Sequence, residues 1–121
     1  MKFNINISNI KFAALALLVA VVAVSCTKKE NLDDVDCGKV SATFATNVKP
    51  IIDAKCATSG CHSANSSNGD FTNYAGVKAK ADNGSIKKRV LEQKNMPPSN
   101  PLSFDELKKI KCWLASGAQN N

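Results

Sequence analysis

The sequence is short and poor in aromatic residues. It has 121 residues, of which 6% are aromatic, and much of its 44% apolar content lies within positions 1–25. A chain of this length forms one small domain at most, and small domains bury a lower fraction of their surface on folding. These facts exclude a multidomain enzyme, a polytopic membrane protein and a large active-site cleft. They also predict that something besides an apolar core stabilises the fold.

Long hydrophobic runs are also missing. The longest one covers residues 12–24 and follows the basic residues Lys2 and Lys11, but a membrane-spanning helix needs about 20 apolar residues. A basic start, a short apolar run and a small residue, here Ser25, are typical of a cleaved secretory signal. We therefore expect residues 1–25 to be a signal peptide.

Cys26 follows this segment directly. The sequence Ala23-Val24-Ser25-Cys26 resembles a bacterial lipobox, which implies cleavage before Cys26 and acylation of its thiol. Because each buried methylene contributes about 0.8 kcal/mol, several acyl chains anchor a protein firmly. The expected product is an exported lipoprotein on a bacterial membrane, facing the periplasm or the cell surface, with residues 26–36 as a charged tether. The alternative is an ordinary signal peptide followed by an unmodified cysteine.

The charge is only mildly basic, with 16 Lys and Arg against 10 Asp and Glu. Nucleic-acid binding requires a denser basic face with aromatic residues that stack on bases, so we exclude a nucleic-acid partner. The folded domain is expected over residues 37–121.

No segment alternates between apolar and polar residues as a strand does, and helical spacing recurs, so the predicted fold class is all-α. The expected helices cover 41–47 and 50–55, with a bend over 47–49, then 72–80 with Thr72 as its cap, and a helix that Ser85 caps. Residues 63–70 and 95–101 are rich in turn formers and should be irregular.

The last helix has the clearest signature. Ser103 and Glu106 form a predicted capping box, and Gly117 is a plausible end. Its apolar stripe is expected to contain Leu107, Ile110, Trp113 and Leu114.

The chemistry is concentrated in Cys56 and Cys61, the latter followed at once by His62. Two cysteines and an adjacent histidine are the arrangement that attaches c-type haem. Over residues 44–118 the chain resembles the small monohaem c-type cytochromes of bacterial lipoproteins. The resemblance implies a helical domain wrapped around one haem c bound to both cysteines. The chain departs from the common motif in having four residues between the cysteines instead of two, and Ser59-Gly60 suits the outward loop that this requires.

Histidine and methionine are scarce. The chain has one His and, besides the initiator, one Met, which is Met96. Haem iron with two protein ligands commonly uses one His and one Met, so we predict that His62 and Met96 are the axial ligands. Alternatively, Met96 simply fills a gap in the core.

Five cysteines are present, and the roles above leave Cys37 and Cys112. Because exported proteins meet oxidising conditions, we predict that these two form a disulfide, which would stabilise the fold by roughly 4 to 5 kcal/mol on the chain-entropy model. The alternative is two free buried thiols.

Two other interpretations of the cysteine and histidine cluster remain open. A structural zinc site could use three thiolates and one imidazole, from Cys56, Cys61, His62 and Cys112. Cys56 and Cys61 could also form a disulfide beside an incidental histidine.

With both axial positions filled, a haem protein transfers electrons and has no vacant iron position for a substrate. We therefore expect an electron carrier and not an enzyme. The alternative is a haem sensor or peroxidase-like enzyme with an open sixth position, which the single histidine disfavours because a peroxidase needs a second acid–base group.

The expected haem pocket consists of Phe44, Ile51, Ile52, Phe71, Tyr74, Val90, Leu91, Leu102 and Trp113. Cationic residues between Phe71 and Met96 could attract an acidic redox partner protein, and Arg89 could pair with a haem propionate. These cations are Lys78, Lys80, Lys87, Lys88, Arg89 and Lys94.

Overall fold

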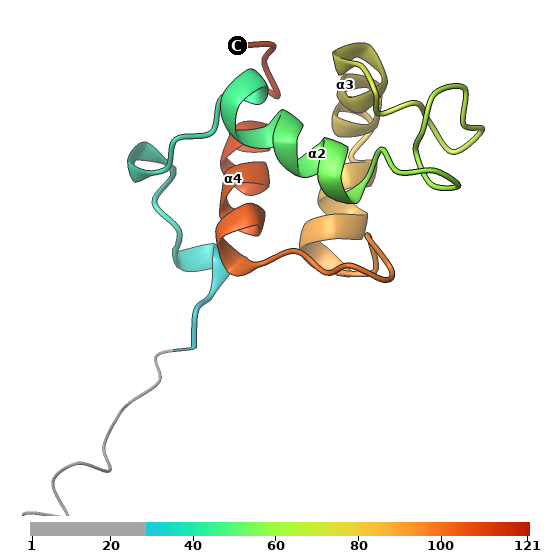
Figure 1. Cartoon of the computed structure of the whole chain (residues 1–121). Helices are drawn as coiled ribbons and strands as arrows, with labels where there is room; N and C mark the ends of the chain where they lie inside the picture. Colours follow the sequence, from blue (N-terminus) through green and yellow to red (C-terminus); the bar gives the residue numbers. More distant parts are fainter. Residues whose placement is uncertain (1–28) are drawn as a thin grey trace, which may run out of the picture.

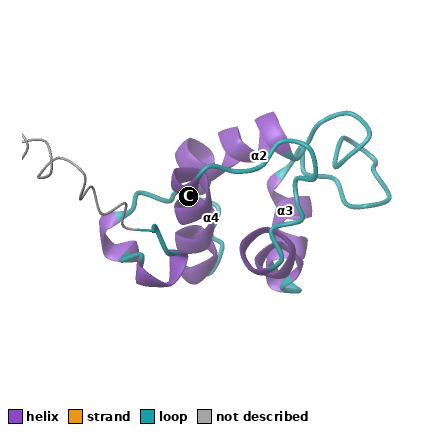
Figure 2. Cartoon of the chain, turned by 90° about the horizontal axis from the view of Figure 1, so that it is seen from below, coloured by secondary structure: helices purple, strands orange, loops and turns teal. Residues whose placement is uncertain are grey.

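The structure is a computed structural model that describes residues 29–121. The predicted signal peptide and Cys26 lie outside the described residues. Within residues 29–121 every regular element is helical, which confirms the all-α class (Figures 1 and 2). None of the described helices is long and apolar enough to cross a membrane. The elements are η2 (Leu32–Asp34), η3 (Cys37–Lys39), η4 (Phe44–Val48), α2 (Lys49–Lys55), α3 (Tyr74–Asp82), η5 (Lys87–Glu92) and α4 (Phe104–Ala115).

The predicted bend at residues 47–49 is wrong. The chain forms one wide π-helical turn, η4, which runs directly into α2. The carbonyl oxygen of Thr43 accepts hydrogen bonds from the backbone N–H groups of both Asn47 and Val48, while the Asn47 side chain accepts one from Thr43 N at 3.0 Å. Asn47 was expected to bend the chain here, but its side chain instead stabilises the π-helical turn. Pro50 lies in the first turn of α2.

Two predicted helix caps are also wrong. Asn73, and not Thr72, caps α3 through its side-chain oxygen, which accepts from Gly76 N at 3.0 Å. The Thr72 side chain donates to Asp70 instead. Ser85 caps nothing, because η5 begins after Ile86 without a side-chain cap. Asn73 therefore takes the place expected of Thr72. Ser85 donates its own N–H to the side-chain oxygen of Asn83 at 3.0 Å.

The predicted ends of α4 are confirmed. Ser103 accepts from Glu106 N at 3.3 Å, and the Glu106 carboxylate accepts from Ser103 N at 2.7 Å, which completes the capping box. At the other end Gly117 has φ +90°, and Ala118 N donates to Trp113 O at 2.9 Å. A glycine at positive φ followed by a hydrogen bond back to the last turn is a common way for a helix to end.

The core forms around Trp113, which is fully buried. Its ring lies 5.4 Å from that of Phe44, which in turn meets the edge of Tyr74 at 5.0 Å. Trp113 and Tyr74 donate their polar hydrogens to the carbonyls of Gln119 and Ala118, so the C-terminal tail closes the core. α4 packs against η4 and η5, and the loop 56–73 projects from the side opposite to where the described chain begins (Figures 1 and 2).

The predicted disulfide is present. Cys37 and Cys112 are bonded across a sequence separation of 75 residues, which ties η3 to a buried position of α4. Lys111 also donates a hydrogen bond to the carbonyl of Leu32. Residues of η2 therefore also pack on α4.

Candidate functional site

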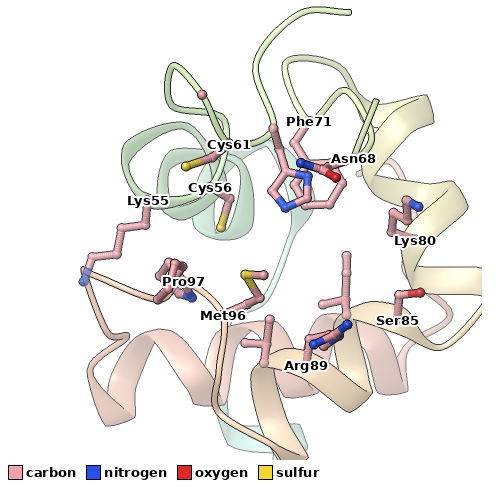
Figure 3. A pocket seen from close by; sticks show the side chains of 15 residues that line it. Lys55, Cys56, Cys61, Asn68, Phe71, Lys80, Ser85, Arg89, Met96 and Pro97 are labelled. Carbon is pink, nitrogen blue, oxygen red and sulfur yellow. The ribbon is translucent and has the colours of Figure 1, made fainter. Parts of the chain in front are cut away.

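A cavity of about 420 Å³ lies between the end of α2 with its following loop and the segment formed by η5 and residues 96–98 (Figure 3). Its volume falls within the range of small-molecule sites. The cavity brings together all four residues predicted to hold a cofactor, namely Cys56, Cys61, His62 and Met96. Its other lining residues are Lys55, Gly60, Asn68, Phe71, Lys80, Ser85, Ile86, Arg89, Val90, Pro97 and Pro98.

The two cysteines occupy a compact turn. Cys56 is the C-cap of α2, directly after Lys55, and donates its N–H to Ile52 O at 2.8 Å. His62 N then donates to Cys56 O at 3.2 Å, which closes the turn. The intervening residues 58–60 are exposed, and Gly60 has φ +79° with nothing within 4 Å of where a side chain would begin. The extra residues between the cysteines therefore bulge outward, as predicted.

Both thiols are free. Burial, helped by the nearby Cys61 and Glu106, raises the pKa of Cys56 to about 11, so this thiol stays protonated at neutral pH. Cys112 is bonded to Cys37 and has no thiolate for a metal. The four-ligand zinc interpretation is therefore wrong, and residues 29–121 contain no other group of three His, Cys, Asp or Glu that could hold a metal ion.

The His62 ring is held in one orientation. Its Nδ1 lies 3.2 Å from Gly69 O, and because a carbonyl only accepts, Nδ1 carries the proton. The ring also stacks on Phe71, with centroids 4.0 Å apart and planes inclined by 7°. This tautomer leaves the lone pair of Nε2 available, and metal-binding histidines are commonly oriented in this way.

Met96 lies across the cavity from Cys56, Cys61 and Phe71 (Figure 3). Its side chain is 38% exposed, which makes it the most exposed large hydrophobic side chain among residues 29–121. It is followed by Pro97 and Pro98, which also line the cavity. Because a core residue would be buried, the interpretation of Met96 as a gap filler does not fit its exposure.

Three cations reach the cavity, which are Lys55, Lys80 and Arg89. Two others from the predicted basic segment pair with acids instead, Lys78 with Asp82 and Lys87 with Glu92. Fewer cationic residues of this segment therefore lie at the cavity than the sequence suggested.

The predicted apolar pocket needs correction. Only Phe71 and Val90 of that set line the cavity, and the others pack in or against the core behind it. Ile86, Pro97 and Pro98 were missed. Ile86 could have been found, because it lies four residues before Val90 on the same helical face. The two prolines could not, because no sequence pattern shows where their loop runs.

Comparisons of this chain with protein-family models, curated proteins and solved structures found no match. The functional argument therefore depends on the chemistry and geometry of these residues.

Proposed function

We propose that this protein is a monohaem c-type cytochrome that carries electrons in a bacterial periplasm or at the cell surface, anchored to the membrane through a lipid on Cys26. The observation that carries the proposal is the meeting of Cys56, Cys61, His62 and Met96 at one cavity. Chance does not readily account for this, because the chain contains a single histidine and a single methionine besides the initiator.

The residues present fit a covalently bound haem. Cys56 and Cys61 are the two free cysteines of residues 29–121, and both line the cavity. They would form the thioether bonds. His62 would bind through Nε2, the nitrogen that its hydrogen bond to Gly69 leaves available, and the thioether of Met96 would be the second protein ligand. The haem would supply one-electron iron chemistry, and a methionine ligand raises its reduction potential relative to a second histidine.

Electron transfer fits these residues better than catalysis does. With His62 and Met96 both committed as ligands, the chain has no further histidine for acid–base work. Phe71, Ile86 and Val90 supply apolar cover. Lys80 and Arg89 favour a redox partner with an acidic surface.

Haem staining after denaturing electrophoresis tests the proposal, because only covalently attached haem stays with the chain. We expect stain with the matured protein and none with Cys56→Ser/Cys61→Ser, which removes both thioether bonds. The matched control is the double variant Cys37→Ala/Cys112→Ala, which removes two cysteines outside the cavity and should keep its stain. A colourless wild-type protein overturns the proposal.

A sensor or peroxidase-like role with an open sixth position is the second candidate. The loop that carries Met96 favours it, because residues 92–95 are all exposed and a ligand on a surface loop is displaced more easily than one held inside the core. The visible spectrum of the oxidised protein separates the two. Low-spin iron that becomes high-spin in Met96→Ala supports the carrier, whereas high-spin iron in both proteins supports the open site.

A further inference from the structure

Gly76, in the first turn of α3, touches the main chain of the loop that leads away from His62. A Cβ atom placed on Gly76 would lie 1.6 Å from the carbonyl oxygen of Asp70 and 2.7 Å from its carbonyl carbon. These are backbone atoms, so no side-chain rotation relieves the overlap. The loop can rest against α3 in this way only because residue 76 has no side chain.

The residue before Asp70 is the one that orients the histidine. Gly69 O accepts the hydrogen bond from His62 Nδ1 at 3.2 Å, and the chain returns at once when Phe71 N donates to His62 O at 2.9 Å. Lys80, one turn after Gly76 on α3, lies against Gly69 with its aliphatic stem. One face of α3 therefore fixes both Gly69 and Asp70.

We infer that Gly76 is a positioning residue for His62, which acts by letting the Asp70 backbone rest directly on α3, in the place where Gly69 O receives the imidazole proton. The contact and the hydrogen bond belong to the chain itself. Their consequence for iron rests on the function proposed above. A hydrogen bond from Nδ1 raises the basicity of the ligating nitrogen, and a more basic ligand stabilises the oxidised metal.

Gly76→Ala tests this inference because the added methyl must push Asp70 away. Two readouts are measured on the full, matured chain. The first is the exchange rate of the His62 Nδ1 proton, followed by NMR in the reduced, diamagnetic protein. The second is the reduction potential. We expect exchange at least tenfold faster and a higher potential, because both depend on the bond to Gly69.

Ala75→Gly is the matched control. Ala75 is exposed in the same turn of α3, and the change lowers helix propensity by about 1 kcal/mol without touching Asp70. We expect neither readout to move. If Gly76→Ala and Ala75→Gly shift both readouts equally, or if Gly76→Ala shifts neither, the inference is overturned.

Asp70→Ala provides a second route should Gly76→Ala fail to fold. It removes the bonds that Thr72 donates to the Asp70 carboxylate and so loosens the same segment without a clash. Faster proton exchange supports the inference, and unchanged exchange overturns it. A colourless protein whose Nδ1 proton still responds to these variants would refute the proposed haem while leaving the role of Gly76 intact.

Discussion

Lys55, the last residue of α2, forms an ion pair with Glu106 in the first turn of α4, with 2.9 Å between Nζ and Oε2. The same ammonium group donates to Pro101 O at 3.0 Å. The carboxylate also accepts from Ser103 N, within the capping box. One ion pair thus connects the residue before Cys56, the segment that follows Met96 and the start of α4.

We predict that Lys55→Met lowers the free energy of unfolding by about 1 kcal/mol, at the upper end for ion pairs that retain some contact with water. Both side chains are less than a quarter exposed, so solvent screens the pair only in part. Urea unfolding followed by circular dichroism measures the change. Lys78→Met is the matched control, since its partner Asp82 is 58% exposed, and its effect should stay below about 0.5 kcal/mol.

The stability should also depend on pH through Glu106. Partial burial alone would raise the pKa of this carboxyl, but the hydrogen bonds from Lys55 and Ser103 outweigh it and hold the pKa below its usual value of 4.5. A lowered pKa in the folded state means that the stabilisation is fully present above the unfolded pKa and is lost as pH falls through the folded one. The difference in urea midpoint between wild type and Glu106→Gln should therefore shrink from pH 7 to pH 3. A constant difference would contradict this origin.

Local chemistry made α4 and the cysteine turn predictable from the sequence. The Ser103 and Glu106 capping box, the Gly117 termination and the exposed bulge before Cys61 each depend on residues a few positions apart. Met96 and His62 could be assigned to one site because each is the single residue of its type beyond the initiator. We could predict that they share one site from the chemistry of haem ligation, and not from the spacing of apolar residues.

The predictions were wrong where two neighbouring residues could both cap a helix, or where the path of the chain decided which residues line the cavity. Asn73 replaced Thr72 as a cap because only its side-chain oxygen reaches Gly76 N. Phe44 and Trp113 were expected in the pocket, but they pack against each other behind it. The contact of Gly76 with Asp70 has no signature beyond a glycine inside a helix, which sequence patterns treat only as an unfavourable residue.

The disulfide should stabilise the domain without serving the cofactor. We predict that Cys37→Ala/Cys112→Ala lowers the free energy of unfolding by about 4 kcal/mol, because the bond closes a long loop of the unfolded chain. Thiol titration of the denatured wild-type protein provides a second check. If Cys26 is acylated and Cys56 and Cys61 are both in thioether bonds, no thiol reacts before reduction and two react after it. Two thiols before reduction would mean that Cys56 and Cys61 are free.

Membrane attachment should depend on Cys26, which precedes the described residues. We predict that Cys26→Ser moves the protein from the membrane fraction to the soluble fraction of the periplasm or medium, since the acyl chains proposed on Cys26 would be its anchor. The haem stain should be unchanged, because the cavity residues begin at Lys55. A variant that stays in the membrane fraction would show that another segment anchors the chain.

The cations at the cavity should govern the rate of reaction with anionic electron acceptors. Lys80 and Arg89 line the cavity, whereas Lys87 pairs with Glu92 and does not line it. With ferricyanide as oxidant at low salt, Lys80→Gln and Arg89→Gln should each slow oxidation by about two- to fivefold, and Lys87→Gln by less than twofold, because the field of a charge weakens with distance.

Salt separates this electrostatic effect from a change in driving force. At about 0.5 M salt the Debye length falls below 5 Å, so the rates of all three variants should converge on that of the wild type. A deficit in Arg89→Gln that persists at high salt and matches a shift in its potential would mean that Arg89 acts on the haem itself, as a partner of a propionate would. A deficit that vanishes with salt would leave Arg89 the role of attracting the acceptor.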